Sequence, residues 1–184
     1  DEAVGRADLL ERKHLSDYPK TEKIDLSRII FMPKEAAVNA LRKTSYQDHK
    51  LDNILDRELI SKSLPALDLC MPIAIQSKIK NIDRTTGAML SGEIAKRYGQ
   101  AGLPDNTISI SFEGSAGQSF GAFLSKGMTF HLQGDANDYL GKGLSGGRII
   151  VTPPKGSTFA PEENILCGNT LLYGATSGEV FING

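Results

Sequence analysis

The chain has 184 residues, with 21 Lys and Arg against 22 Asp and Glu and a formal net charge of -1. This balance argues against nucleic acid or an acidic membrane surface as the main partner, and no apolar run approaches the roughly 18 residues of a spanning helix. Cys70 and Cys167 form neither a CxxC ligand pair nor a disulfide framework, which indicates two thiols in a reducing compartment. The first residue is Asp1 rather than Met, so we expect the chain to have been cut from something longer.

The first part of the chain has the composition of helices with connections. Residues 1–86 hold 15 Lys and Arg, 14 Asp and Glu, and a single glycine. Apolar residues at helical spacing between Leu51 and Leu59 predict a helix over residues 48–60, with Asp48 as its N-cap. Shorter helices are predicted over residues 7–13 and 35–43, with a solvated connection over residues 16–25.

From Pro72 onward the apolar period changes to two, which is typical of strands with one buried face. A short helix, Glu93–Tyr98, is predicted between the first two strands, with Ser91 as its cap and Gly99 as its terminator. The predicted strands are residues 73–79, 107–112, 128–132, 149–151 and 180–182.

The last part is glycine-rich and repetitive, with 14 of the 19 glycines between Gly114 and Gly184. Three glycine-bounded stretches begin at Gly117, Gly141 and Gly168, and a short apolar run follows each one. Tight glycine corners, short strands and a period in the twenties predict a mainly β fold, a parallel β-solenoid whose successive coils stack. A β-sandwich is the alternative, but its turns favour Asn-Gly or Asp-Gly pairs, and Asn183-Gly184 is the only such pair here.

The solenoid prediction assigns two sets of residues. The expected corner positions are Gly114, Gly117, Gly121, Gly134, Asp135, Asn137, Asp138, Gly141, Gly143, Gly146, Gly147, Gly168 and Gly174. The expected inward-facing apolar ladders comprise Ile108, Ile110, Phe112, Leu124, Phe130, Leu132, Ile149, Val151, Leu171, Val180 and Ile182.

Several chemical motifs match only in their letters. Residues 141–146 match GxGxxG, but a strand-like run ending in prolines follows, where a dinucleotide site needs a helix N-terminus. Residues 143–147 match GxSxG, but the hydrolase arrangement needs a later histidine and the last one is His131. No catalytic residue and no cofactor-binding residue is therefore assigned.

A metal site is not predicted either. His131, Asp135 and Asp138 have no zinc-ligand spacing, and the acidic stretch is too short for a calcium loop. We expect the Asp and Asn side chains there to bond local amides at a corner, and Arg148 to form a structural ion pair.

Residues 114–123 and 134–151, together with residues 81–94 and 5–10, closely resemble the C-terminal glycine-repeat domain of the glutamate synthase large (alpha) subunit. The resemblance covers nearly the whole chain and implies a right-handed parallel β-helix. A more distant relative with the same repeat is the C subunit of formylmethanofuran dehydrogenase. The implied domains are a helical connecting segment, residues 1–65, and a glycine-rich β-helix, residues 66–184, truncated where the repeat is still running.

The resemblance also implies a function. The parent oxidoreductase makes two glutamates from glutamine and 2-oxoglutarate, with FMN and an iron–sulfur cluster held in its other parts. This fragment is expected to hold no cofactor and to be a non-catalytic scaffold that packs against the amidotransferase and the FMN-binding synthase domain. Self-association or fraying at an open end near residues 171–184 is predicted, and the expected location is the cytoplasm or the plastid stroma.

Two alternatives stay open. The chain could be a free-standing β-helix subunit that assembles with separate glutamate synthase or formylmethanofuran dehydrogenase chains. An independent β-helix enzyme acting on polysaccharide fits less well, because residues 107–184 carry only ten scattered charges.

Overall fold

The computed structural model describes residues 45–184, and residues 51–184 form one of the two units into which the chain divides. The helices and connection predicted between residues 7 and 43 lie outside the described residues. The elements of the described unit are the helices α2 (Leu55–Lys62), α3 (Leu64–Leu69) and α4 (Ala88–Tyr98), the 3-10 turns η4 (Gly99–Ala101) and η5 (Pro161–Glu163), and the strands β1 (Ile73–Ile79), β2 (Ile108–Ala116), β3 (Met128–Ala136), β4 (Ser145–Thr152) and β5 (Ser177–Ile182).

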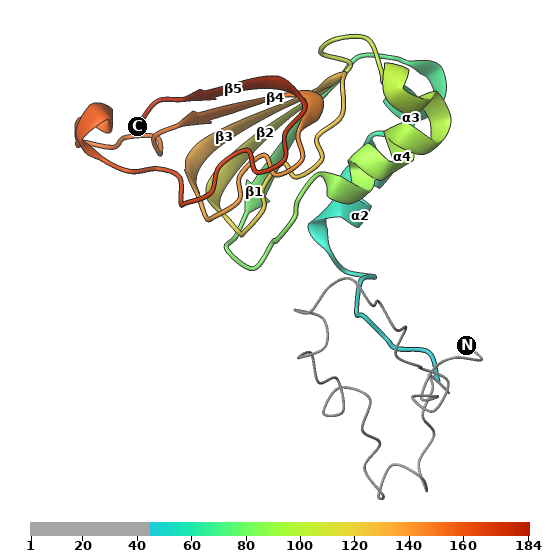
Figure 1. The fold of residues 1–184 in the computed structure, drawn as a ribbon, viewed down its shortest axis with the longest axis horizontal. Helices are drawn as coiled ribbons and strands as arrows, with labels where there is room; N and C mark the ends of the chain where they lie inside the picture. The colour runs from blue at the N-terminus through green and yellow to red at the C-terminus, as the bar shows by residue number, and fades with distance from the viewer. Residues whose placement is uncertain (1–44) are drawn as a thin grey trace, which may run out of the picture. The chain divides into compact units, whose positions relative to one another are not determined.

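The five strands form one open sheet in the order β1-β2-β3-β4-β5, and every neighbouring pair is parallel (Figure 1). Register stacks like positions above one another, so that one inward-facing row contains Ile75, Ile110, Phe130, Ile149 and Val180. The alternation of apolar and polar residues therefore gives the sheet one buried face, as period two requires.

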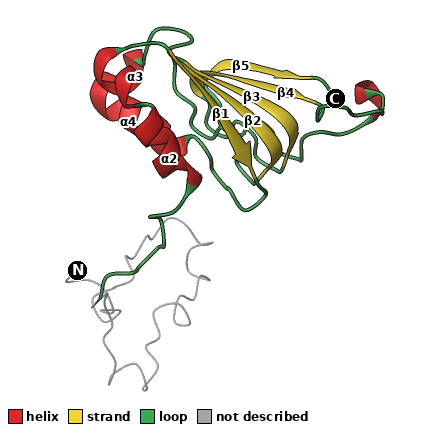
Figure 2. Cartoon of the chain, turned by 180° about the vertical axis from the view of Figure 1, so that it is seen from behind, coloured by secondary structure: helices red, strands yellow, loops and turns green. Residues whose placement is uncertain are grey.

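The predicted fold class is wrong. The structure is α/β: α4 lies in the connection between β1 and β2, the helices gather beside one end of the sheet, and a single open sheet stands where a mainly β right-handed β-helix was expected (Figure 2). The physical reason lies in the glycine-rich stretches between the later strands. They form tight turns that contain left-handed residues, and such backbone cannot extend into the further strands that a β-helix needs.

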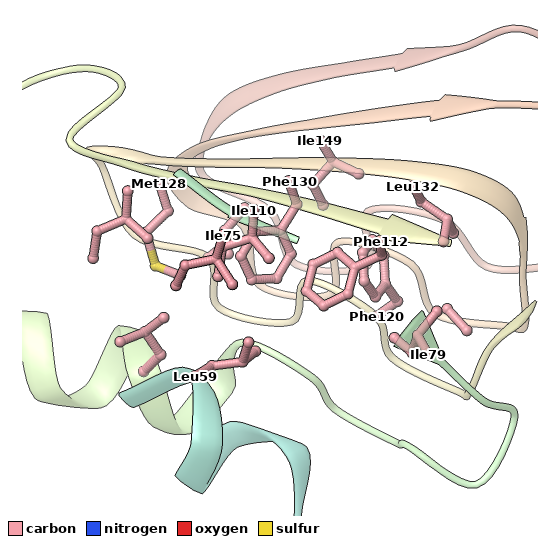
Figure 3. Close-up of a cluster of buried hydrophobic side chains, with 14 of the residues drawn as sticks. Leu59, Ile75, Ile79, Ile110, Phe112, Phe120, Met128, Phe130, Leu132 and Ile149 are labelled. Carbon is pink, nitrogen blue, oxygen red and sulfur yellow. The ribbon is translucent and has the colours of Figure 1, made fainter. Parts of the chain in front are cut away.

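The core lies between the buried sheet face and the side chains of the turns. Phe112, Phe120 and Phe130 are at most 1% exposed, and the ring centroid of Phe112 lies 5.3 Å from that of Phe120 and 5.0 Å from that of Phe130, both edge-on (Figure 3). Leu124 is also fully buried as predicted, whereas Leu171 is 39% exposed, which contradicts its predicted inward position. Leu171 lies in the last of the glycine-rich turns that the structure describes, so it lacks the cover that a following turn gives to its counterparts.

The helices close the other end of this core. Leu90 and Ile94 of α4 are fully buried and belong to the same cluster as the sheet residues. Leu59 of α2, also fully buried, lies beside these sheet residues in Figure 3. Within the described residues, each helix is too short or too polar to span a lipid bilayer.

Asp56 joins α2 to α4 through two hydrogen bonds. Its carboxylate accepts the backbone N–H of Gly87 at 2.7 Å and that of Met89 at 2.8 Å, and the side chain is only 4% exposed. Burial raises the pKa of the Asp56 carboxyl above its ordinary value, while the amide hydrogen bonds act in the opposite direction. The first turn of α4 thus obtains its cap from a residue 31 positions earlier in the chain.

Two helices begin at residues other than those predicted. The helix predicted from Asp48 begins at Leu55, and Asp48 instead accepts the N–H of Lys50 at 2.8 Å in a local turn. The helix predicted from Glu93 begins at Ala88, and Ser91, its expected cap, is a buried interior residue.

Replacing Asp56 by alanine should destabilise the unit by about 2–3 kcal/mol, because two amides would lose a buried, charged acceptor. Urea unfolding should show a lower midpoint with an unchanged slope. The matched control is Asp52→Ala at an exposed position, which should shift the midpoint little. Equal midpoints for the two variants would contradict the capping role.

Candidate functional site

Three turns between the strands share one backbone pattern. Each has five residues, and the first, third and fifth are left-handed, with φ between 57° and 69°. These segments, called the stacked turns below, are Ser119–Phe123, Tyr139–Gly143 and Thr170–Gly174. Only Gly121, Gly141, Gly143 and Gly174 fill such positions with glycine, so the packing holds five other side chains in a strained region.

The alternating pattern makes the turns bond to one another. The first residue donates its N–H to the carbonyl just before the following turn, and the fifth residue donates to a carbonyl within that turn. The third residue donates to a carbonyl of the preceding level. The bonds run from Ser119 to Asp138 (2.8 Å), Tyr139 to Asn169 (3.0 Å), Phe123 to Lys142 (2.8 Å), Gly143 to Tyr173 (2.9 Å), Gly121 to Thr86 (3.0 Å), Gly141 to Phe120 (2.9 Å) and Leu172 to Leu140 (2.9 Å).

Asp56 lies at the first level of this stack. Gly87 occupies the position that Gly121 and Gly141 occupy in later turns, and it too is left-handed, with φ of 97°. The later glycines donate to a carbonyl of the turn before them, whereas Gly87 donates to the Asp56 carboxylate. Asp56 therefore replaces a missing turn as the acceptor, and it is the residue that the sequence reasoning missed.

The predicted corner residues lie at several kinds of position. Gly121, Gly141, Gly143 and Gly174 lie in the stacked turns, Gly114, Gly134, Asp135, Gly146 and Gly147 lie within strands, and Gly117, Asn137, Asp138 and Gly168 lie in the connections. Their assignment as structural corner residues stays a prediction.

Gly134 is a point of close backbone approach. A Cβ at Gly134 would collide with the carbonyl oxygen of Gly114 on the neighbouring strand, and a Cβ at Gly114 would collide with the carbonyl oxygen of Ile79. The neighbouring backbones thus approach so closely here that β2 and β3 both require glycine at this level.

The acidic and amide side chains near these glycines bond to neighbouring levels. Asp135 Oδ1 accepts the hydroxyl of Ser115 at 2.7 Å, and Asp138 Oδ1 accepts the N–H of Asn169 at 2.7 Å. Asn137 Nδ2 donates to Asn81 Oδ1 at 3.1 Å. These side chains tie levels together in the way that corner residues would.

The GxGxxG match has no phosphate-binding geometry. Strand β4 begins at Ser145, so no helix N-terminus follows the glycines. The amides of Gly141 and Gly143, which would have to face a phosphate, already donate to the carbonyls of Phe120 and Tyr173.

The candidate metal residues do not form a ligand group. His131 Nε2 lies 3.1 Å from Thr152 Oγ1 on the exposed sheet face, and residues 45–184 contain no cluster of three or more His, Cys, Asp or Glu side chains that could hold a metal. Arg148 pairs with Glu179 on the adjacent strand at 2.6 Å, which confirms the structural ion pair predicted for it.

The two cysteines lie in different environments. Cys70 is exposed and its thiol donates to the Tyr98 hydroxyl oxygen at 3.4 Å. Cys167 is half-buried, and burial, with a smaller contribution from the charge of Asp135, raises its pKa to about 11. Its thiol is therefore protonated, and unreactive, near neutral pH.

An open groove of about 410 Å³ crosses the first residues of β3, β4 and β5. Its charged walls include Arg148 and Glu179, which pair with each other. Its glycines Gly147 and Gly178 are required by the packing, because a Cβ there would meet Leu124 or the Gly147 carbonyl oxygen. Asp105 and Lys126 are the other charged residues of its lining.

Comparison with known proteins identifies this arrangement of turns and strands. Residues 56–184 match the model of the GXGXG motif family, so the chain belongs to that family.

The chain is 48% identical, over 185 residues, to glutamate synthase [NADH] of Saccharomyces cerevisiae, covering 100% of this chain and 9% of that protein. It is 45% identical over 189 residues to the glutamate synthase [NADPH] large chain of Bacillus subtilis, and 40% identical over 186 residues to ferredoxin-dependent glutamate synthase 2 of Synechocystis, covering 100% of the chain and 12% of each relative. The chain spans about a tenth of the length of these curated relatives. The resemblance to glutamate synthase predicted from the sequence is confirmed.

Gly134→Ala should destabilise the unit by about 3 kcal/mol, since the new methyl group cannot avoid the Gly114 carbonyl without moving a strand. Gly92→Ala is the matched control: Gly92 is a helical residue of α4 with open space around it, so this change should stabilise by about 0.5–1 kcal/mol. Chemical unfolding measures both. A tolerated Gly134→Ala would show that the strands can separate there.

Cys70 should react with a thiol reagent at pH 8 at least about tenfold faster than Cys167, because Cys167 is protonated and partly covered. Peptide mass spectrometry after timed labelling distinguishes the two sites. In denaturant the rates should converge, and equal rates in the native chain would be inconsistent with the buried environment of Cys167.

Proposed function

We propose that this chain is a non-catalytic structural domain of a glutamate synthase large subunit. The observation that carries the proposal is the use of the glycine-motif amides, which bond turn to turn instead of facing a ligand. Membership of the GXGXG family and the glutamate synthase relatives support the assignment to this enzyme.

In this proposal the domain packs against the amidotransferase and the FMN-binding synthase domain and keeps them in position. FMN and the iron–sulfur cluster are held by those other parts of the polypeptide, and the reaction that makes two glutamates from glutamine and 2-oxoglutarate takes place there. The expected location is the cytoplasm or, in photosynthetic eukaryotes, the plastid stroma. Self-association through the edge strand β5 stays a prediction.

The names of the relatives support a role that is independent of the electron donor. They specify NADH, NADPH and ferredoxin, yet each protein contains a segment 40–48% identical to this chain. If this domain determined the electron donor, its sequence would be expected to differ more strongly between the NADH-, NADPH- and ferredoxin-dependent relatives. The length of these relatives also favours a domain of a large polypeptide over a free-standing subunit.

The test uses the complete enzyme that contains this chain. Gly134→Ala should lower the temperature at which activity is lost, because the domain unfolds more easily, while the KM values for glutamine and 2-oxoglutarate stay within about twofold at low temperature. Gly92→Ala is the control and should not lower that temperature. The isolated chain should retain no flavin and hydrolyse no glutamine.

Glutamine turnover by the isolated chain would contradict the proposal. So would a large rise in either KM caused by Gly134→Ala under conditions where the enzyme remains folded, because that result would place substrate contacts in this domain.

A further inference from the structure

The helical end of the unit carries an apolar surface that the domain's own fold does not explain. The residues from Leu64 to Pro72 include two buried side chains, Ala66 and Leu67, which serve the core. The others face solvent, and Leu64, Leu69 and Met71 are 44%, 70% and 53% exposed. We call this surface the α3 patch, and its apolar members are Leu64, Pro65, Leu69, Cys70, Met71 and Pro72.

The backbone holds the α3 patch in a fixed shape. Cys70 ends α3 in the left-handed conformation, with φ of 54°, and its N–H bonds the carbonyl of Ala66 at 3.0 Å. The next amide, that of Met71, bonds the carbonyl of Pro65 at 3.3 Å. A preorganised apolar surface loses little conformational entropy when another surface covers it.

The only charge within the patch is neutralised locally. The Asp68 carboxylate lies 3.5 Å from Arg97 Nε, and Arg97 also pairs with Glu93. Burying the patch would therefore not strand an isolated charge. The exposed sheet face is mixed: its central row is polar at Gln76, Ser111 and His131 and becomes apolar only at Ile150 and Phe181.

We infer that the α3 patch is the face by which this domain packs against another domain of the same large-subunit polypeptide. The inference rests on the proposed function. Two observations favour this occupant. About nine-tenths of each relative's length lies outside the matched segment, so such a polypeptide has abundant surface to supply. The patch is also apolar and free of unpaired charge, which is typical of permanent interfaces rather than transient ones.

Cys70 reports on the patch from within it. In the isolated 184-residue chain its thiol should react readily with a maleimide, and in the complete enzyme the same thiol should react at least about tenfold more slowly. Peptide mass spectrometry identifies the labelled site.

A double variant, Leu69→Asp with Met71→Asp, adds a second readout. It should leave the unfolding temperature of the isolated chain within about 1 °C, since both side chains are exposed. In the complete enzyme it should restore Cys70 labelling and lower the temperature of activity loss. The control is Ile82→Asp, which alters another exposed apolar residue just beyond the opposite end of β1 and should change neither the Cys70 labelling nor the temperature of activity loss.

Each remaining outcome overturns the inference. Equal Cys70 labelling in chain and enzyme would show that the patch stays open. Hydrogen exchange of this segment, compared between the complete enzyme and the isolated chain, then tests the proposed function. Slower exchange elsewhere in the segment would retain a packing role through another face, and unchanged exchange throughout would contradict the packing role as well. Slow labelling of Cys70 in the isolated chain would indicate that residues preceding the patch cover it. If that labelling slowed further as the chain concentration rose, the cover would be a second copy of the chain.

Discussion

The hydrogen bonds between the stacked turns are the constraint on which the rest of the unit depends. A chain that passes repeatedly beside a buried core must pair its backbone groups, and it does so here without extended strands on that side. Left-handed residues at every second position send successive amides alternately to the following and the preceding turn. The strands that alternate with these turns pair in parallel, β2 with β3 and β3 with β4, so the sheet and the turns repeat together along the chain.

Such a stack must be closed where it begins, and Asp56 performs that task. The amide of Gly87 has no earlier turn to bond, so a carboxylate from α2 accepts it, and the same carboxylate caps α4 through Met89. One side chain thus fixes the two helices to the first turn. The cost is the burial of a charged group, which is reflected in its raised pKa. The helices are consequently part of the stack rather than an attachment to it, as the fully buried Leu59 also indicates.

The sequence predicted the structural features that depend on residues close together in the chain. Alternation of apolar residues located β1 and β2, and short apolar runs after the glycine-bounded stretches located β3, β4 and β5. The start of α4 could not be found in this way, because its cap lies 31 positions away. The β-helix prediction failed for a different reason. The glycine spacing correctly indicated parallel stacking. Ser119, Phe123 and Tyr139, however, adopt left-handed backbone conformations that their residue types do not predict, and the chain turns there where a further strand was expected.

The same ladder limits what the domain can do for an enzyme. The amides of Gly141 and Gly143 donate to the carbonyls of Phe120 and Tyr173, so the motif that most resembles a nucleotide cradle does not direct them at a ligand. Under the proposed function, contacts with other domains come from side chains that the fold leaves uncovered. The stacked turns pair with one another, and the Asp56 cap attaches α2 and α4 to them. Leu69, at the end of α3, and Met71, just after it, extend into solvent. An apolar surface whose backbone is already held by hydrogen bonds suits the packing role proposed above, because covering it costs little conformational entropy.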